Sequence, residues 1–227
     1  MATGSSRLNK MRRQPVQARS QERVQKILDV AEELFATHGY AATTTKEIAA
    51  QAQIPIGSLY QFFPNKGAIV QALFVRYNDL LHQQLALSNR AELAELPLSI
   101  LVDKLTDICI RFFLKHPGYY KTFMEVQGGM PEIGEIEDAA DAKLIQEFAL
   151  LLKQREAIQE DIDYAAIAFV LAKTSGQLIW IALGQEEKFQ RQLFTEMKRF
   201  SLSYLKSYFP SAIKSTKNTN EPDSLKP

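Results

Sequence analysis

Apolar residues recur every three or four positions along most of the chain, which is the spacing of one helix face. Between residues 18 and 38 this face consists of Val24, Ile27, Leu28, Ala31, Leu34 and Phe35. Gly39 follows at once, and glycine commonly ends a helix because it tolerates a left-handed backbone. The pattern predicts a first helix over 18–38.

A second, short helix is predicted over 45–52. Thr44 precedes it and Glu47 follows three residues later, the reciprocal capping pattern that satisfies unpaired amides at a helix start. Its inward face is expected to consist of Ile48, Ala49 and Ala52, small enough for another helix to approach closely.

The stretch IPIGSLYQFFPNK, residues 54–66, predicts a third short helix over 55–63. Pro55 suits the first position of a helix and Pro64 ends it. Leu59, Phe62 and Phe63 share an inward face. Five residues are left pointing outward: Ile56, Gly57, Ser58, Tyr60 and Gln61.

The remainder is also helical in pattern. Asn65 is expected to cap a fourth helix that reaches about Asn89. Further helices are predicted over 97–115, 118–127, 135–155, 163–184 and 188–208. The absence of strand alternation or a fixed repeat predicts an all-α fold. The expected organisation is a basic flexible arm (1–17), a three-helix DNA-binding domain (18–66), a larger helical regulatory and dimerisation domain (67–209) and a disordered tail (210–227).

Two short helices joined by a tight turn and braced by a first helix describe a helix-turn-helix, whose second helix enters the DNA major groove. Gln61 and Ser58 suit hydrogen bonds to base edges, and Ile56 suits contact with a thymine methyl group. Gly57 allows close approach, while Tyr60 and Lys66 suit phosphates. Periodicity alone equally allows a small three-helix core with an ordinary solvated surface.

Charge is unevenly distributed. Residues 1–26 contain seven bases and one acid, whereas residues 125–163 contain eleven acids and three bases. The basic end would attract a polyanion such as DNA, although a solvated tail has the same composition. The basic arm therefore either contacts DNA phosphates or only aids solubility.

Composition argues against several other classes. The longest apolar run, 164–172, ends at Lys173, so no membrane span is expected. The amino terminus lacks the apolar stretch of a secretory signal, which favours a cytoplasmic protein. Cys109 is the single cysteine, the three histidines are scattered, and no glycine-rich phosphate loop occurs. We expect no catalytic residue, no metal site and no cofactor, and hence no enzyme.

The block from Ile27 to Leu73, with ELFATHGY, TT before EIA, GSLYQFF and a following lysine, closely resembles the DNA-binding domain of the tetracycline-repressor (TetR) family. Three positions depart from the family pattern: Gln53 replaces a frequent turn glycine, Pro55 a serine cap and Gly67 an acidic residue. A left-handed backbone at Gln53 would carry strain. The resemblance implies DNA contacts from Thr45, Ile56, Gly57, Ser58, Tyr60, Gln61 and Lys66.

The resemblance also implies a homodimer formed by the last two helices, which binds an inverted-repeat operator in double-stranded DNA. The sequence permits this, because 163–184 is rich in small residues and 188–208 has more apolar residues than one buried stripe needs. Burial within a single chain is the alternative.

A small-molecule effector that shifts the DNA-binding helices is implied as well. Candidates to line a pocket for a mostly apolar ligand are Phe112, Phe113, Tyr120, Phe123, Met124, Gln177 and Trp180, although core packing explains each equally well. The segment 128–143 is expected to be a mobile gate. The implied function is a dimeric repressor released by its ligand. A transcriptional activator of the same fold and a helical interaction module without specific DNA binding are the alternatives.

Overall fold

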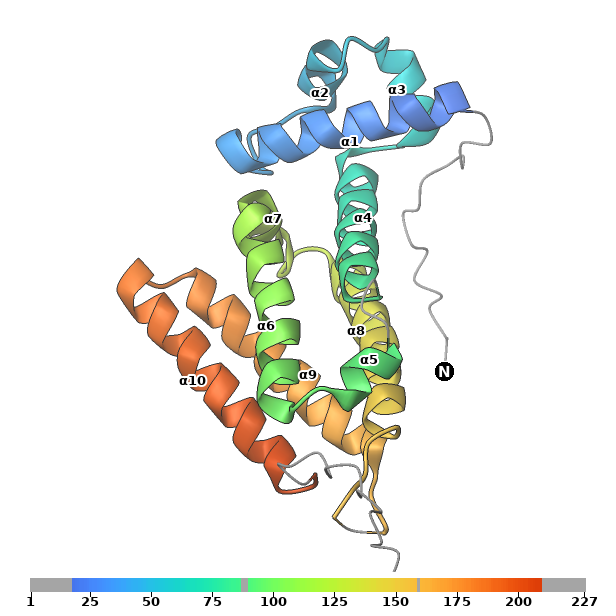
Figure 1. Ribbon diagram of the computed structural model, residues 1–227. Coiled ribbons are helices and arrows are strands. Elements are labelled where there is room, and N and C mark those ends of the chain that lie inside the picture. Colours follow the sequence, from blue (N-terminus) through green and yellow to red (C-terminus); the bar gives the residue numbers. More distant parts are fainter. Residues whose placement is uncertain (1–17, 87–89, 159, 210–227) are drawn as a thin grey trace, which may run out of the picture.

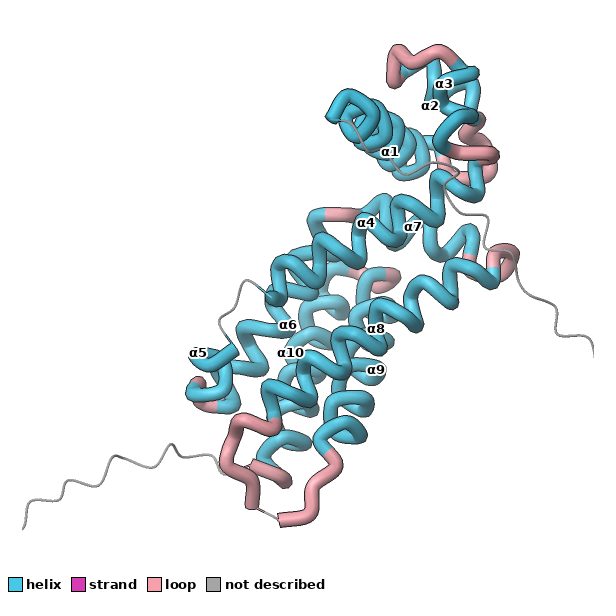
Figure 2. Tube along the Cα trace, turned by 90° about the vertical axis from the view of Figure 1, so that its right-hand side faces the viewer, coloured by secondary structure: helices cyan, strands magenta, loops and turns pink. Residues whose placement is uncertain are grey.

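The computed structural model describes residues 18–86, 90–158 and 160–209 (Figure 1). The predicted arm (1–17) and tail (210–227) lie outside this range. All regular elements within it are helices, as the tube in Figure 2 shows, which confirms the all-α prediction. The helices are α1 (Ala18–His38), α2 (Thr45–Gln51), α3 (Ile56–Phe62), α4 (Lys66–Ala86), α5 (Arg90–Glu95), α6 (Leu98–Lys115), α7 (Pro117–Val126), α8 (Pro131–Leu152), α9 (Tyr164–Leu183) and α10 (Glu187–Lys206).

Helices α1 to α3 form the predicted helix-turn-helix at one end of the molecule. In Figure 1, α1 lies across the end of α4, with α2 and α3 on its far side. All six apolar residues predicted for the inward face of α1 are buried, and so are Ile48 and Ala52 on the α2 side. Leu59 and Phe63 complete this core and are fully buried.

Side-chain caps fix the starts of α2 and α4. The backbone N–H of Glu47 donates to Oγ1 of Thr44 over 3.2 Å, while the Glu47 carboxylate lies 3.3 Å from Nδ1 of His38. The N–H of Ala68 donates to Oδ1 of Asn65 over 2.9 Å, which confirms the predicted cap.

Most predicted helix starts agree with the structure to within one residue, including that of α3, but the start of α8 is wrong by four. Pro55 is the residue before α3, since its ψ of 134° is extended, and its carbonyl accepts the N–H groups of Ser58 and Leu59. Helix α8 begins at Pro131, four residues earlier than predicted, and Gly134 lies inside it. Burial of Ile133 stabilises this first turn, so most of the predicted gate segment is regular helix.

The larger part of the molecule is a bundle of α4 to α10. Helix α4 runs from the helix-turn-helix into the bundle and packs against α8, while α9 packs between α8 and α10 (Figure 1). Short helix α5, which the sequence did not predict, contributes buried Leu93, and its last carbonyls accept hydrogen bonds from Arg155.

Helix α9 has the length and mean hydropathy, 1.6, of a membrane span by composition alone. The expectation that no segment has these properties is therefore wrong for α9. Within the fold, α9 packs against three neighbouring helices, and its Lys173 forms ion pairs with Asp138 and Asp141 of α8. Core helices of water-soluble bundles have the same composition.

Candidate DNA-binding surface and effector cavity

The outward face of α3 is exposed as predicted. Ile56 is 38% and Tyr60 40% exposed, whereas Leu59 between them is fully buried. Gly57 and Gln61 are exposed as well, and Ser58 is half-buried. Apart from its neighbours in the helix, no described residue lies within 4 Å of the position that a Cβ on Gly57 would occupy. A two-turn helix with one buried face and one free polar face fits the major groove.

The first residue of α2 contacts the second half of α3 on the same side. Oγ1 of Thr45 lies 3.0 Å from the hydroxyl of Tyr60. Both hydroxyl groups belong to residues predicted to contact DNA, so the two predicted contacts form one polar spot rather than two separate ones. Either hydroxyl can turn to a phosphate oxygen when DNA arrives.

The turn between α2 and α3 has the strained backbone that the sequence suggested. Gln53 adopts φ = +54°, the left-handed region that glycine occupies without penalty. Its N–H donates to the Ala50 carbonyl, and the N–H of Ile54 donates to the Ala49 carbonyl. This pair of hydrogen bonds is a Schellman motif, which terminates α2 and directs the chain into α3.

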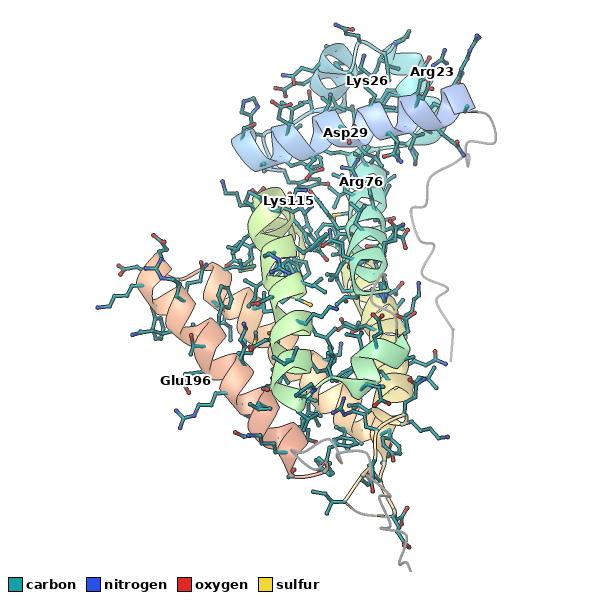
Figure 3. All side chains as sticks on the ribbon, viewed as in Figure 1. Arg23, Lys26, Asp29, Arg76, Lys115 and Glu196 are labelled. Atoms are coloured by element: carbon teal, nitrogen blue, oxygen red, sulfur yellow. The ribbon has the colours of Figure 1, made fainter. Side chains whose placement is uncertain are left out.

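Basic side chains border the α3 surface. Arg19, Arg23 and Lys26 of α1 and Lys46 of α2 are all exposed. Figure 3 shows Arg23 and Lys26 on the side of α1 where α2 and α3 lie. In the sequence the α1 bases stand out only as part of a charge excess. Their helical spacing, outside the buried stripe, was the available signal that they share an exposed part of α1.

Lys66 differs from its predicted role as a phosphate contact. Its Nζ donates to the carbonyls of Tyr40 (2.5 Å), Ala41 (3.2 Å) and Thr43 (2.7 Å), and it lies 4.2 Å from the Tyr40 ring centroid. Three carbonyl acceptors and a ring face engage the ammonium group, which therefore fastens the loop between α1 and α2. Burial lowers the pKa of Lys66, which Glu125 partly offsets.

A cavity of about 210 Å³ lies inside the bundle, between α4, α6, α8, α9 and α10. Its wall follows α6 from Leu101 to Phe113, a helix length of about 18 Å, so the cavity is long and narrow. Most of the wall is aliphatic or aromatic. The polar or charged wall residues are Asn78, Thr106, Tyr119, Glu137, Asp141, Glu147, Ser175 and Ser201, with Cys109 beside them.

Two of the seven predicted ligand residues, Phe113 and Trp180, line this cavity. Tyr120 and Phe123 stack on the Trp180 ring, with centroids 5.6 and 4.6 Å away, and support the wall without forming it. The other three do not line the cavity either: Phe112 is buried in the core, and Met124 and Gln177 are exposed.

A carboxylate, a phenol and an amide meet at one end of the cavity. The hydroxyl of Tyr119 lies 2.9 Å from each carboxylate oxygen of Glu137. Nδ2 of Asn78 donates to Oε1 of Glu137 over 3.0 Å. Burial raises the pKa of Glu137, and these two hydrogen bonds oppose the rise. We call these three residues the polar end of the cavity.

Sequence reasoning did not single out Asn78 or Glu137. Glu137 was counted with the acidic stretch, yet it falls on the inward stripe of α8, formed with Ile133, Leu144, Phe148 and Leu151. The available signal was a single acid on an otherwise apolar stripe. Such a residue indicates a buried carboxylate, and a buried carboxylate needs a hydrogen-bonding or charged partner nearby.

Cys109 lies in the cavity wall. Burial raises the pKa of its thiol to about 12. A thiol with this pKa is almost wholly protonated at neutral pH and is a poor nucleophile. Cys109 therefore acts as a small apolar wall residue.

The polar end is connected to α1 through stacked rings and one carboxylate. Tyr119 stacks on Tyr77, with ring centroids 4.5 Å apart. The Tyr77 hydroxyl is hydrogen-bonded to Glu32 of α1, and burial followed by this carboxylate raises the pKa of Tyr77. Glu32 also binds Nη2 of Arg76 at 2.5 Å and lies 3.4 Å from Nδ1 of His116.

Arg76 links α4 to two positions on α1. Its Nη1 lies 2.6 Å from Oδ1 of Asp29, one turn before Glu32. Figure 3 shows Arg76 at the upper end of α4, directly below Asp29. The Arg76 side chain is only 15% exposed and Asp29 is 68% exposed, so the pair with Glu32, which is 26% exposed, is the better shielded of the two from solvent.

Helix α7 contacts the carboxyl-terminal end of α1 directly. A Cβ on Gly118 would come within 3.1 Å of Cβ of Ala36, so glycine allows the two helices to approach closely. Nζ of Lys121 donates to the Ala36 carbonyl over 3.3 Å. Beyond α1, the Ala41 N–H donates to Glu125 over 3.2 Å. Helix α7, which carries Tyr119 into the cavity wall, therefore also supports the helix-turn-helix.

The last two helices present apolar residues to solvent. We call this surface the outer face: Phe169, Val170 and Ile181 of α9 with Phe189 and Phe200 of α10, between 37% and 52% exposed. In Figure 3 the nearby Glu196 points away from the bundle. A surface hollow of about 920 Å³ between α8 and α9 borders Phe169. Apolar patches of this kind usually mark an interface.

Comparison with known proteins agrees with these features. Residues 27–73 match the family described as bacterial regulatory proteins, tetR family, and residues 97–205 match the tetracyclin repressor-like C-terminal domain. HTH-type transcriptional regulator YvkB of Bacillus subtilis (strain 168) is 41% identical over 54 residues, which are 24% of this chain and 29% of YvkB. Regulator YuxN of the same organism is 27% identical over 119 residues, 52% of this chain and 40% of YuxN.

The chain thus spans less than half the length of the two curated relatives it matches. Among solved structures, a putative TetR-family regulator from Mesorhizobium loti superposes with a TM-score of 0.67 at 19% identity, covering 85% of this chain and 100% of that one, which supports the fold. With both family regions matched in order, the chain belongs to the TetR family of transcriptional regulators, which combine a DNA-binding helix-turn-helix with a carboxyl-terminal ligand-binding domain.

Proposed function

We propose that this protein is a homodimeric transcriptional repressor that binds an inverted-repeat operator in the cytoplasm and is released from DNA by a small molecule. The observation that carries the proposal is the free outer side of α3 on a fully packed three-helix core. Ile56, Gly57, Tyr60 and Gln61 are exposed there, although the same helix buries Leu59 completely.

Readout of the DNA bases is assigned to the exposed residues of α3. Positioning on the DNA backbone is assigned to the surrounding hydroxyl groups and basic side chains. Gln61 can donate to and accept from a base edge, and Ile56 can contact a thymine methyl group. Thr45 and Tyr60 are suited to phosphates, as are Arg19, Arg23, Lys26 and Lys46. Lys66 is assigned a supporting role in the α1–α2 loop because its ammonium group already has three carbonyl partners.

Dimerisation is assigned to the outer face of α9 and α10. Five large apolar side chains exposed on two adjacent helices are costly in water, and a second copy would cover them by pairing the same surface about a two-fold axis. Such a dimer presents two recognition helices to successive major grooves, which requires an inverted repeat.

Ligand control is assigned to the cavity and to its contacts with α1. A molecule that displaces Tyr119 also acts on Tyr77, which is bonded to Glu32, and on α7, which supports the end of α1. We propose that the two routes together tilt the helix-turn-helix. A coupling free energy of about 1–3 kcal/mol between ligand and operator is usual for such a switch.

The test is selection of bound sites from random duplex DNA by the purified protein. An inverted repeat, bound by two chains per site, is the expected result. Its position over a promoter, and lower transcription from that promoter when the protein is added in vitro, would support repression. Higher transcription would indicate an activator.

Binding that is sequence-independent and strongly salt-dependent would contradict the proposal. It would mean that basic residues alone contact DNA and that α3 does not read bases. The alternative of a helical interaction module would then take its place.

A further inference from the structure

The charged groups of the effector cavity all have the same sign. Its wall contains three acids, Glu137, Asp141 and Glu147. Among the residues that the structure describes, no lysine, arginine or histidine lines this cavity. An anionic ligand group placed in the cavity would therefore meet only negative charges, whereas a cationic group would meet complementary ones.

Two of the three acids have a basic partner outside the cavity. Oδ2 of Asp141 lies 2.6 Å from Nζ of Lys173, and Oε2 of Glu147 lies 3.9 Å from Nδ1 of the buried His82. Glu137 differs, because in the described part of the chain its carboxylate is bonded by the neutral groups of Asn78 and Tyr119.

Acidic neighbours make the ionised form of the buried Glu137 carboxylate unfavourable. After burial, the groups that raise its pKa are Asp141 and Asp138, both acids on the same helix. A buried carboxylate with acidic neighbours is stabilised when a positive group comes within a few ångströms of it. No described residue forms an ion pair with Glu137, so a ligand can supply that positive group.

Aromatic rings complete the same region. Phe113, Tyr119 and Trp180 line the cavity, and their centroids lie within 5.5 Å of one another. Ring faces attract cations, most strongly in the case of tryptophan and when the site excludes water. The opposite end of the cavity, around Leu93, Leu101 and Leu205, is aliphatic.

We propose that the cavity binds an amphipathic organic cation, a protonated amine or quaternary ammonium head on an apolar tail. The head lies against Glu137 among the rings of Tyr119 and Trp180, and the tail lies along α6 toward Leu101. This assignment specifies the effector class for the proposed regulator and rests on the proposed function of its cavity.

The head position explains how such a ligand would be sensed. A cation beside Glu137 competes with the Tyr119 hydroxyl for the same carboxylate oxygens. Tyr119 is also the residue that stacks on Tyr77, whose hydroxyl binds Glu32 on α1. Release of Tyr119 from Glu137 is therefore the first step toward α1.

The chain contains one tryptophan, so its fluorescence reports directly on the cavity. The full-length protein is titrated with decyltrimethylammonium, decanoate and 1-decanol, each below its micelle concentration. These probes share the tail and differ in head charge. The cation is expected to change Trp180 emission and to bind at least about tenfold more tightly than decanoate.

Glu137→Gln removes the charge while keeping the size of the side chain and one acceptor oxygen for Asn78 and Tyr119. It should weaken decyltrimethylammonium binding about tenfold and alter 1-decanol binding by less than about twofold. Glu135→Gln is the matched control, because Glu135 is an exposed acid on the same helix. The comparison of the three probes on the unaltered protein remains valid even if the Glu137 variant does not fold.

Equal or tighter binding of decanoate or 1-decanol would overturn the cationic assignment, and so would the absence of any cation binding by both fluorescence and calorimetry. Operator binding is measured on the same preparation without ligand. If operator binding fails while the cation binds Trp180's cavity, the ligand class stands and the regulator function falls. If the operator is bound but the cation is not, the reverse holds.

Discussion

Gln61 is the exposed α3 side chain best suited to read a base, because its amide both donates and accepts a hydrogen bond. Gln61→Ala should reduce affinity for the selected operator by about 1–3 kcal/mol, or roughly 5- to 150-fold, while affinity for random DNA stays within about twofold. Fluorescence anisotropy at a fixed salt concentration measures both.

Gln83→Ala is the control for this change, since Gln83 is an exposed glutamine on the part of α4 that belongs to the bundle. An equal loss of affinity for operator and random DNA would show that Gln61 contacts the backbone and carries no sequence information.

Glu137 should make stability depend on pH. Burial raises its pKa in the folded protein above the ordinary value of 4.5. The folded state therefore holds the proton more tightly, which stabilises it below about pH 4.5, and this contribution is lost as pH rises through the folded pKa. Glu137→Gln should consequently gain stability relative to the unaltered protein as pH increases.

Urea unfolding of both proteins at a series of pH values from 4 to 8 measures this difference, for which about 1.4 kcal/mol corresponds to each unit of pKa shift. Parallel stability curves would mean that the carboxylate titrates alike in the folded and unfolded states.

At the scale of single elements, the α2–α3 turn contains a removable strain. Gln53 has φ = +54°, where a side chain costs about 1–2 kcal/mol and glycine costs nothing. Glycine also increases the entropy of the unfolded chain, so Gln53→Gly should stabilise the protein by a net of about 0.5–1 kcal/mol. For a chain of this length the melting temperature should rise by about 1–4 °C.

Ala50→Gly provides the comparison, because Ala50 is exposed within α2 and glycine should destabilise the helix there by about 1 kcal/mol. If both variants destabilise equally, the turn is not under strain.

The junction between α4 and α1 depends on Arg76. Arg76→Met removes the partner of Asp29 and Glu32 while keeping the apolar stem. We expect a loss of about 1–3 kcal/mol in stability, because Glu32 stays half-buried with fewer donors. The effect of ligand on operator affinity should also shrink toward zero, since one of the contacts that orient α1 is gone.

Chemical unfolding and operator titrations with and without decyltrimethylammonium measure the two effects. Arg199→Met is a suitable control, as Arg199 is 78% exposed and lies 3.9 Å from its partner Glu196. Such surface pairs contribute about 0–1 kcal/mol.

Length determined which helices the sequence could predict. Helices α1 (21 residues), α9 and α10 (20 residues each) repeat their apolar spacing often enough to be recognised. Gly39 marks the end of α1 and Asp163 the start of α9. Helix α5 has six residues and buries only Leu93 and Ala94, too few for a period to emerge. The start of α8 was missed because Pro131 and Gly134 suggest a break until the burial of Ile133 is known.

At the scale of the whole molecule, the outer face is the proposed dimer interface. Phe169→Arg replaces one of the five apolar side chains of the outer face with a charge and should convert the dimer to a monomer with unchanged helix content. Operator affinity should fall by at least about 100-fold, because each half-site is then bound by a separate chain. Analytical ultracentrifugation and circular dichroism measure assembly and folding.

Val75→Arg alters an equally exposed apolar residue on α4, outside the outer face, and should leave the assembly unchanged. A Phe169 variant that remains dimeric would place the interface elsewhere, and a monomeric unaltered protein would contradict the proposed dimer.

The α3 surface could be predicted from the sequence more fully than the polar end of the cavity, for a physical reason. The α3 surface consists of neighbours in one short helix, so helical spacing separates Tyr60 from Leu59 without tertiary information. The polar end joins residues from α4, α7 and α8, and only their packing brings Asn78, Tyr119 and Glu137 together. The ammonium group of Lys66 donates to three carbonyls of the α1–α2 loop, and this contact likewise exists only once the loop is folded.

Helix α1 is held by α4 at Asp29 and Glu32 and, near its carboxyl-terminal end, by α7 at Ala36, and it carries charge near its first turn, so in the proposed switch it acts as a lever. Gly118 of α7 contacts it at Ala36, whereas Arg19 lies seventeen residues away, about 26 Å along the helix axis. A rotation of only about 5° at the supported end sweeps the far end through about 2 Å, more than hydrogen-bond geometry tolerates. A displacement in the cavity too small to open the bundle is thus magnified where the chain would meet DNA.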